Sequence, residues 1–517
     1  MIKETEITVL PSNINNQDLI RKLVIKKLGI AAGDLSGFKI VKSSIDARKK
    51  PVYRLRISAF INEEPIDDFT KFKFKDVSKG KRVIIVGSGP GGLFAALRFL
   101  ELGIKPLIFE RGKEVRERRY SLRNIMLDGV VDENSNYCFG EGGAGTYSDG
   151  KLYTRSIKRG NVKRILDLLI FHGAGNNIAV DSHPHIGSNK LPKIVEQIRN
   201  TILQYGGEVN FNSRVTDFII EENKIKGVIV NGAKEVLSDA VLVATGHSAS
   251  DIWSIIEKHK LKLETKPFAL GVRIEHPQEL IDSIQYKVKP RPLNLPAAYY
   301  SLRNSVKGRG IYSFCMCPGG VIVPAATGKN ELVLNGMSVA KRNSPFANSG
   351  IVVSVNEKDW KSYSKFKYFA GLKFRERIEK ISFEAGGGKL KAPAQRVTDF
   401  VGGKTSTDLP ETSYKPGVVS YDLNRIFPKN IALSLKLSLT QFGEKMKGYY
   451  TEEAIILAPE SRTSSPVKVP RDSETRMHIE CEGLFPVGEG AGYAGGIVSA
   501  AIDGENSADA VGNYLNI

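Results

Sequence analysis

Residues 83–111 read VIIVGSGPGGLFAALRFLELGIKPLIFER, and this segment decides the fold. An apolar run ends in a G-x-G-x-x-G pattern made of Gly87, Gly89 and Gly92, a helical pattern follows, and a second apolar run ends at Glu110. The acid lies 23 residues after the first glycine (110 − 87 = 23). That is close to the spacing of about 20 residues expected for a carboxylate that binds a ribose. The order of strand, glycine turn, helix, strand and acid predicts a dinucleotide-binding fold.

The residue types in this segment suit the binding of a pyrophosphate. Gly87 permits a tight turn, the missing Cβ of Gly89 lets the backbone approach the phosphates, and Gly92 lets the helix pack closely on the strand. Gly91 lies in the first turn of the helix, whose N–H groups and positive dipole end attract an anion. Glu110 can accept hydrogen bonds from ribose hydroxyls.

The same glycine spacing occurs twice more, at residues 140–145 and 490–495. The first match is followed by SDGKLYTR, which has no helical pattern, and the second leaves no room for another strand and acid. We expect neither match to form an independent dinucleotide domain.

The stretch GLFPVGEGAGYAGGIVSAAIDG, residues 483–504, resembles the second FAD motif of flavoproteins of the two-dinucleotide-binding-domain type. In those proteins a strand ends in Gly-Asp, whereas this chain has Gly488-Glu489, and glutamate is one methylene longer. The stretch AVLVATGHS, residues 240–248, resembles their ATG strand, and Val215 matches the position whose backbone meets the adenine.

Further segments resemble a bacterial family of FAD-dependent dehydrogenases, also called NAD(FAD)-utilising dehydrogenases, whose members have no settled substrate. These segments are CFGEGGAGTYSDGKLYTR, PHIGSNKL, GVRIEHPQ, FCMCPGG, APAQRVTDF, SRTSSPVKVPRD and EGAGYAGGI. The resemblance covers about residues 40–510 and implies FAD as cofactor, but it implies no particular reaction. The residues expected to contact FAD are Gly87, Gly89, Gly91, Gly92, Glu110, Arg111, Gly142, Gly143, Gly145, Lys151, Val215, Thr245, Gly246, Gly488, Glu489, Gly495, Gly496 and Ile497.

The chain is expected to be an α/β protein of several domains, since 517 residues exceed the usual size of one domain. We predict a discontinuous Rossmann-type FAD domain at 79–262 and 440–517. A strand-rich α+β substrate domain at 263–439 is inserted into it. Residues 1–78 form a small N-terminal α+β domain, for which a ferredoxin-like fold is the candidate, and the sequence DVSKGK is its linker to the FAD domain.

The composition narrows the class of protein further. There is no run of about 18 apolar residues, and the first residues, MIKETEITVL, lack the apolar region of a signal peptide. Four cysteines do not indicate a disulfide framework. We therefore expect a cytoplasmic protein with no membrane partner, and no pattern in the chain indicates an oligomeric state.

The formal net charge of +19 has two interpretations. It describes either an ordinary solvated basic surface or a surface that attracts a polyanion or an acidic substrate. The charges are spread along the chain, which makes nucleic acid the less favoured partner, although Arg48-Lys49-Lys50 forms a local basic cluster.

The electron donor is not indicated by a motif. No second complete glycine turn with helix, strand and acid occurs near the middle of the chain, where related flavoenzymes hold NAD(P)H. The glycines at 386–388 are followed by KLKAP instead. Either NAD(P)H visits the flavin face as a transient co-substrate, or the reductant is a different compound.

Three residues are candidates for a catalytic role. His276 ends a strand in RIEHP and can act as general acid or base, although a structural histidine is the simpler interpretation. Arg462 and Ser464 lie in RTSSP, a cluster that can bind a flavin edge or an anion, or can form an ordinary polar turn. His183 and His185 lack accompanying carboxylates or cysteines, so we expect no metal site.

Cys315 and Cys317 stand two apart in FCMCPGG. In a regular strand they point to the same face, where bridging them strains the geometry of a disulfide. We expect them to line the pocket, and a redox pair is the alternative. Cys138 and Cys481 are expected to be small buried residues.

These observations predict an FAD-dependent oxidoreductase that transfers a hydride between an unidentified small organic substrate and flavin N5. Two alternatives remain open at this stage. One is a flavin-dependent enzyme that modifies nucleic acid, and the other is a non-catalytic flavin-binding redox sensor.

Overall fold

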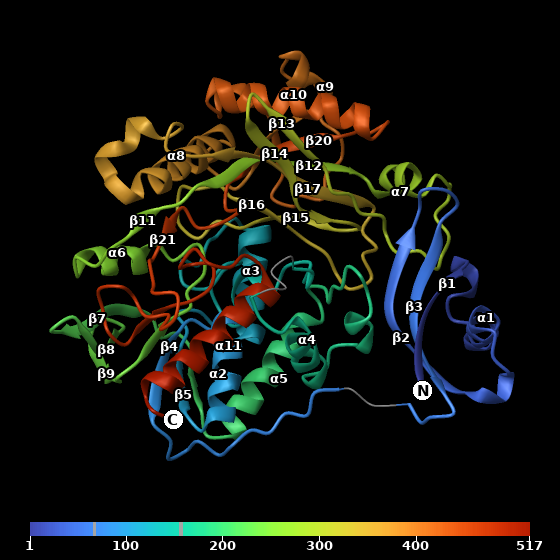
Figure 1. Ribbon diagram of the computed structural model, residues 1–517. Coiled ribbons are helices and arrows are strands. Elements are labelled where there is room, and N and C mark those ends of the chain that lie inside the picture. Colours follow the sequence, from blue (N-terminus) through green and yellow to red (C-terminus); the bar gives the residue numbers. More distant parts are fainter. Residues whose placement is uncertain (66–68, 155–158) are drawn as a thin grey trace.

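A five-stranded parallel sheet contains the two apolar runs of the opening segment (Figure 1). The structure is a computed structural model and describes residues 1–65, 69–154 and 159–517. Neighbouring strands are parallel and follow the order β22-β10-β4-β5-β6. Their bounds are β4 (Arg82–Val86), β5 (Lys105–Phe109), β6 (Glu208–Asn210), β10 (Val241–Val243) and β22 (Leu484–Pro486).

Helices cover one face of this sheet because the side chains on that face are apolar. Val83 and Ile85 of β4 pack in one core with Leu97, Ile198 and Val498, which lie on three different helices. The helices of the parallel-sheet part are α2 (Pro90–Leu102), α3 (Val115–Leu127), α4 (Val162–Phe171), α5 (Leu191–Gln204), α6 (Ser250–Lys258) and α11 (Ile497–Tyr514), of which α6 packs on the opposite face.

The opposite face of the sheet carries a second layer. Ile84 and Val86 point to this face and pack with Val215, Phe218 and Trp253. The strands of this layer form an antiparallel sheet in the order β7 (Val215–Glu221), β8 (Lys224–Val230) and β9 (Lys234–Leu237). Because both faces of β4 are buried, its sequence is a continuous apolar run rather than an alternating one.

Helices α2 and α11 pack with their backbones in contact. A Cβ added to Gly504 of α11 would lie 2.1 Å from the carbonyl oxygen of Gly91 in α2. Glycine at 504 is therefore required for this close approach. The contact lies near the beginning of α2, at the end where both helices line the same cavity.

A seven-stranded sheet forms a cap above the parallel sheet (Figure 1). Its order is β13-β14-β17-β12-β20-β18-β19, and all pairs are antiparallel except β18 with β19. The strands are β12 (Phe268–Pro277), β13 (Arg303–Val306), β14 (Arg309–Cys317), β17 (Phe346–Val355), β18 (Ala392–Arg396), β19 (Val418–Ser420) and β20 (Ile455–Glu460). Its helices are α7 (Gln278–Tyr286), α8 (Ala370–Ala385), α9 (Val397–Gly402) and α10 (Lys429–Lys445), and a hairpin joins β15 (Val321–Pro324) to β16 (Leu334–Met337).

The cap extends further along the chain than the boundary at 440 that we expected. Strand β20 pairs with β12 and β18 inside the cap sheet. The chain returns only through β21 (Val467–Lys468), which pairs with β11 (Glu264–Thr265) at the crossing between the two parts. The partners of β20 lie far away in sequence, and no local pattern identifies them.

The N-terminal module has fewer elements than a ferredoxin-like fold. Within residues 1–61 it contains β1 (Ile2–Val9), α1 (Gln17–Leu28), β2 (Leu35–Asp46) and β3 (Val52–Ile61), with strand order β1-β3-β2. A ferredoxin-like unit needs a further helix and strand. The predicted linker is also not free, since Val77 is buried and its N–H donates to the Tyr205 carbonyl at 2.8 Å.

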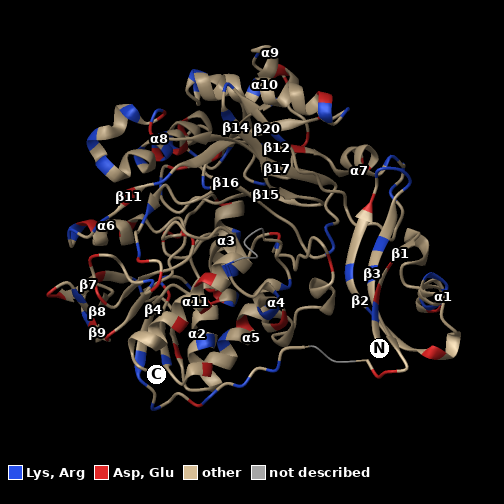
Figure 2. Ribbon diagram, in the orientation of Figure 1, with Lys and Arg blue, Asp and Glu red and all other residues tan. Residues whose placement is uncertain are grey.

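Charged side chains are distributed over the N-terminal module, the cap and the parallel-sheet part (Figure 2). In the N-terminal basic cluster, Arg48 is paired with Asp46 at 2.5 Å, and on β3 Arg54 is paired with Glu6 at 2.5 Å. None of the helices in the described ranges has the length and apolar character needed to cross a membrane.

Candidate active site

One cavity of about 320 Å³ lies between the parallel sheet and the cap. The glycine turn after β4, the N-termini of α2 and α11 and strand ends of the cap all contribute to its wall. The predicted cofactor residues that line it are Gly87, Gly89, Gly91, Glu110, Arg111, Gly143, Gly145, Lys151, Val215, Thr245, Gly246, Gly488, Glu489, Gly495, Gly496 and Ile497.

Several glycines leave space in this cavity that a side chain would fill. A Cβ added at Gly89 would have the Ala244 carbonyl oxygen, 4.0 Å away, as its only described neighbour within that distance, and a Cβ at Gly246 would have none within 4 Å. At Gly496, the nearest described atom would be 3.9 Å away. Two helix N-termini thus meet an open space bordered by bare backbone, which fits a pyrophosphate.

Gly92 and Gly142 do not line the cavity, and the structure gives them different tasks. A Cβ at Gly92 would lie 2.0 Å from the Gly87 carbonyl oxygen and 3.1 Å from Ile85 Cγ2 of β4, so this glycine permits close packing of the helix on the turn and on the strand. Gly142 has a φ of 76° and would place a Cβ 1.9 Å from Thr146 Oγ1. Both residues shape the wall of the cavity rather than contact its contents.

Glu110 is buried and its carboxylate accepts four hydrogen bonds from the protein. The amide and hydroxyl of Ser88 donate to Oε2, and the amides of Gly112 and Gly140 donate to Oε1, each at 2.9 Å. Four donors use the full capacity of a carboxylate. Glu110 therefore ties the first glycine turn to two neighbouring loops, in addition to lining the cavity where we expected a ribose contact.

Cations and an aromatic ring form the end of the cavity beyond Glu110. Arg111 lies over the ring of Phe139, with 4.2 Å between the guanidinium carbon and the ring centroid. Its guanidinium donates to Asp251 at 3.1 Å, and Arg214 donates to the same carboxylate at 3.0 Å. Val215 also lines this end. A flat cation on an aromatic ring beside an apolar side chain suits an adenosine.

Glu489 lines the cavity in the loop that joins β22 to the helix α11. Burial raises the pKa of its carboxyl group to about 8, and nearby Lys266 partly opposes that rise. The side chain is therefore mostly protonated and uncharged at neutral pH, which reduces its repulsion of a phosphate.

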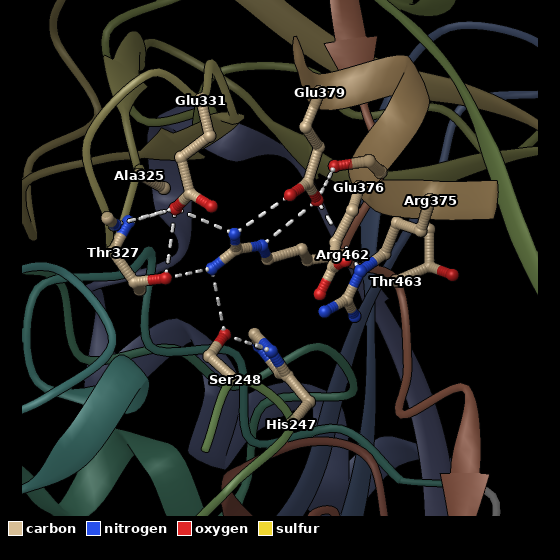
Figure 3. Close-up of polar contacts among 12 residues, drawn as sticks. His247, Ser248, Ala325, Thr327, Glu331, Arg375, Glu376, Glu379, Arg462 and Thr463 are labelled. Atoms are coloured by element: carbon tan, nitrogen blue, oxygen red, sulfur yellow. Dashed lines mark hydrogen bonds and ion pairs between the residues drawn. The ribbon is translucent and has the colours of Figure 1, made fainter. Parts of the chain in front are cut away.

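Arg462 forms the centre of a buried ion network on the cap side (Figure 3). It donates to both carboxylate oxygens of Glu379, at 3.1 and 2.9 Å, and to Glu331 at 2.8 Å. Burial alone would raise the pKa of Glu331, but Arg462 and the amides of Thr327 and Gly328 hold it at about 2. The predicted site residue Arg462 is thus fixed in the cavity wall by two carboxylates.

His247 and Ser248 connect this network to the loop after β10 (Figure 3). Arg462 donates to Ser248 Oγ at 3.3 Å, and Ser248 Oγ lies 2.8 Å from His247 Nδ1. Burial, together with the charges of Arg462 and Arg375, lowers the pKa of His247 to about 3, so its imidazole is neutral. We did not predict a role for His247. The available signal was its place after a parallel strand, where ligands of such sheets bind.

Cys138 lines the cavity beside these residues and is only partly buried, contrary to our expectation of a buried position. Its Sγ lies 3.4 Å from Ser248 Oγ. Cys481 is buried as expected.

Two further ion pairs border the cavity. Lys151 Nζ lies 3.4 Å from Asp149, whose carboxylate also accepts two hydrogen bonds from Arg342 at 3.0 and 2.5 Å. Glu460, at the end of β20, lies 2.6 Å from Arg273. Burial would lower the pKa of Lys151, but Cys317 and Asp149 hold it above its usual value, so the ammonium group is charged.

Two of the predicted catalytic residues lie outside the cavity lining. His276 is buried in the cap, where its Nε2 lies 2.8 Å from the Tyr449 carbonyl oxygen and its ring contacts the Tyr449 ring. Ser464 lies next to Thr463, which does line the cavity, but is not itself part of the lining. We correct both assignments, because a residue that does not reach the cavity cannot contact a reactant there.

Comparison with protein families identifies the class. Residues 267–463 match a family described as "FAD-dependent protein, C-terminal domain-like", and residues 1–60 match a domain of unknown function. Together with the parallel sheet and the glycine-lined cavity, the first match identifies an FAD-binding flavoprotein with an α/β fold.

The chain belongs to the same family as an uncharacterised protein of Clostridium beijerinckii, with which it is 40% identical over 508 residues, covering 94% of each chain. A thiamine thiazole synthase of Methanococcus vannielii is 23% identical over 190 residues, which are 34% of this chain and 60% of that protein.

Two solved structures are similar to the chain at low sequence identity. CtdE in complex with FAD and a substrate is 12% identical with a TM-score of 0.32, covering 83% of this chain and 80% of that one. A geranylgeranyl bacteriochlorophyll reductase-like protein of Thermoplasma acidophilum is 16% identical with a TM-score of 0.34, covering 84% and 80%.

The two glycines of the opening motif predict different effects of substitution. Gly89→Leu places a side chain in the open cavity, so the purified protein is expected to fold but to lack bound FAD.

Gly92→Ala meets the Gly87 carbonyl, so it is expected to lower the free energy of unfolding by about 2–3 kcal/mol. Thermal melting and flavin absorbance measure the two effects. Gly33→Leu, where a Cβ meets nothing within 4 Å among the described residues, is the control. Full flavin occupancy in Gly89→Leu contradicts the assignment.

The raised pKa of Glu489 predicts a pH dependence of FAD affinity. Below pH 8 the carboxyl group is mostly neutral, and above it the added negative charge repels the pyrophosphate. For a repulsion of about 1.4 kcal/mol by the ionised carboxylate, the dissociation constant of FAD is expected to rise about five-fold between pH 7 and 9. Glu489→Gln should remove this dependence, as measured by fluorescence titration of the apoprotein. Parallel pH profiles for both proteins would refute the assignment.

Proposed function

We propose that the protein is an FAD-dependent oxidoreductase that transfers a hydride between a small organic substrate and flavin N5. The observation that supports this proposal is that one cavity is lined both by the glycine turns and by reactive side chains of the cap. Bound FAD would supply the hydride acceptor for this reaction.

The parallel-sheet part holds the cofactor in this proposal. The amides at the beginning of α2 and α11 bind the pyrophosphate, while Arg111 and Val215 contact the adenosine. The helix end at Gly496 also adds positive dipole charge to the cavity, where it stabilises negative charge.

The cap side holds the substrate. Lys151 carries a charged ammonium group whose carboxylate neighbour, Asp149, is shared with Arg342. One carboxylate balances two cations there, so the local charge is positive. We infer that the substrate carries a carboxylate or another anionic group, which Lys151 Nζ orients. His247, which is neutral, can donate or accept a hydrogen bond on the same side.

A small molecule is favoured over nucleic acid as the substrate. Arg48 and Arg54, two of the basic residues of the N-terminal module, are engaged by Asp46 and Glu6. The positive charge at Lys151 lies instead inside the cavity, where a small anion fits. NAD(P)H remains a proposed transient co-substrate that approaches the cavity without a nucleotide-binding domain of its own.

Anaerobic stopped-flow reduction tests the proposal. NADH, NADPH and then mixtures of small organic acids are added to the holoprotein while the absorbance of oxidised flavin is followed. At least one reductant is expected to bleach the flavin. Lys151→Met is expected to slow bleaching by the productive reductant by about ten- to hundred-fold, since a hydrogen bond to a charged group contributes about 1.5–3 kcal/mol.

Lys447→Met serves as the matched control because Lys447 is exposed and outside the cavity. It should reduce at the wild-type rate. If the flavin is fully bound but no reductant bleaches it, the protein is a flavin-binding sensor and the proposed enzymatic function is wrong.

A further inference from the structure

Strand β14 is interrupted where it borders the cavity. Its pairing with β17 shifts register between Phe314 and Cys317, and Cys315 has a φ of 43°. A left-handed conformation at a residue other than glycine costs about 1–3 kcal/mol and is retained when the surroundings require it. The cap therefore maintains a strained bulge at the position of its two neighbouring cysteines.

The bulge directs both thiols toward one space. Cys315 and Cys317 both line the cavity, and the side chain of Cys315 is exposed there. Cys317 Sγ lies 3.2 Å from the Cys315 carbonyl oxygen, so the side chain of Cys317 folds back toward residue 315. Our expectation that these cysteines are poorly placed for a disulfide assumed a regular strand. Strand β14 is not regular at this point.

Two cationic side chains lie near the Cys317 thiol. Lys151 Nζ lies 3.6 Å from its Sγ, and Arg273 lies 3.7 Å from it. Arg273 also donates to the Cys315 carbonyl at 3.0 Å and is fixed by Glu460 and Asn348 at 2.6 and 2.8 Å. Cations beside a sulfur stabilise the negative charge that forms there when a disulfide is broken.

We propose that Cys315 and Cys317 form a dithiol–disulfide pair that exchanges two electrons with the bound FAD. In the oxidising direction two S–H bonds break, one S–S bond forms, and two electrons and two protons leave the cysteines. Oxidised FAD is the acceptor, and reduced FAD returns the electrons in the reverse reaction. This proposal rests on the proposed oxidoreductase function. It implies that a second compound, itself a disulfide or a dithiol, exchanges electrons with the cysteine pair.

The short spacing suits a reversible bridge. A disulfide that spans a single intervening residue closes a small, strained ring, and strained bridges are the more easily reduced ones. Such a strained, easily reduced bridge is typical of catalytic rather than structural disulfides.

A reductive titration tests the pair. Holoprotein is oxidised with ferricyanide, desalted and titrated anaerobically with dithionite, which supplies two electrons per equivalent. Wild type is expected to consume two equivalents per FAD, whereas Cys315→Ser and Cys317→Ser should each consume one. Cys481→Ser, at a buried cysteine outside the cavity, is the control and should consume two.

Mass spectrometry of the oxidised protein gives a readout independent of the flavin. After alkylation in denaturant, the peptide with Cys315 and Cys317 should carry an internal disulfide, while Cys138 and Cys481 are alkylated. Consumption of one equivalent by wild type, or alkylation of both cysteines after oxidation, overturns the proposal. The same titration shows separately whether the flavin is bound and reduced, so failure of the pair is distinguishable from failure of the proposed function.

Discussion

The site depends on the backbone contact between α2 and α11. Gly504 lets α11 approach the Gly91 carbonyl so closely that any Cβ would collide with it. This contact holds the beginnings of two helices at one cavity, although their sequences lie about 400 residues apart. Each helix begins after a parallel strand and presents free amides and a positive dipole end to that cavity. Because the positive ends of two helices face the same cavity, the cavity favours a ligand with two negative charges, such as a pyrophosphate.

The cap supplies a rigid wall to that space. Arg462, Glu331 and Glu379 are bonded to one another, and Arg375 adds a further buried cation beside Glu379 at 3.5 Å. Removing one partner of such a network leaves an uncompensated buried charge, so its members hold each other in fixed positions. A wall fixed in this way positions Ser248 and His247 and gives the reacting groups a defined orientation.

The elements that sequence reasoning predicted are those set by local patterns. The strand from Val83, the helix after Gly89 and the helix after Gly496 follow from apolar periodicity and glycine turns within about 30 residues. The cap sheet could not be predicted in this way, because β12 and β20 pair across about 180 residues of intervening chain. The assignment of His276 failed for the same reason. The local sequence around a histidine at the end of a strand does not differ between a residue that faces a cavity and one that faces a core. His247 was missed for the converse reason, because its neighbours Arg462 and Arg375 come from distant segments.

We propose that the beginnings of α2 and α11, together with the part of the cavity lined by Arg111 and Val215, hold the dinucleotide. The most direct test is the affinity of the apoprotein for FAD, FMN and riboflavin. Isothermal titration at constant salt and pH measures all three. The structure predicts that FAD binds at least about a hundred-fold more tightly than FMN, because FMN lacks the second phosphate and the adenosine, and charge-assisted hydrogen bonds contribute about 1.5–3 kcal/mol each. Equal affinities for FAD and FMN would contradict this account.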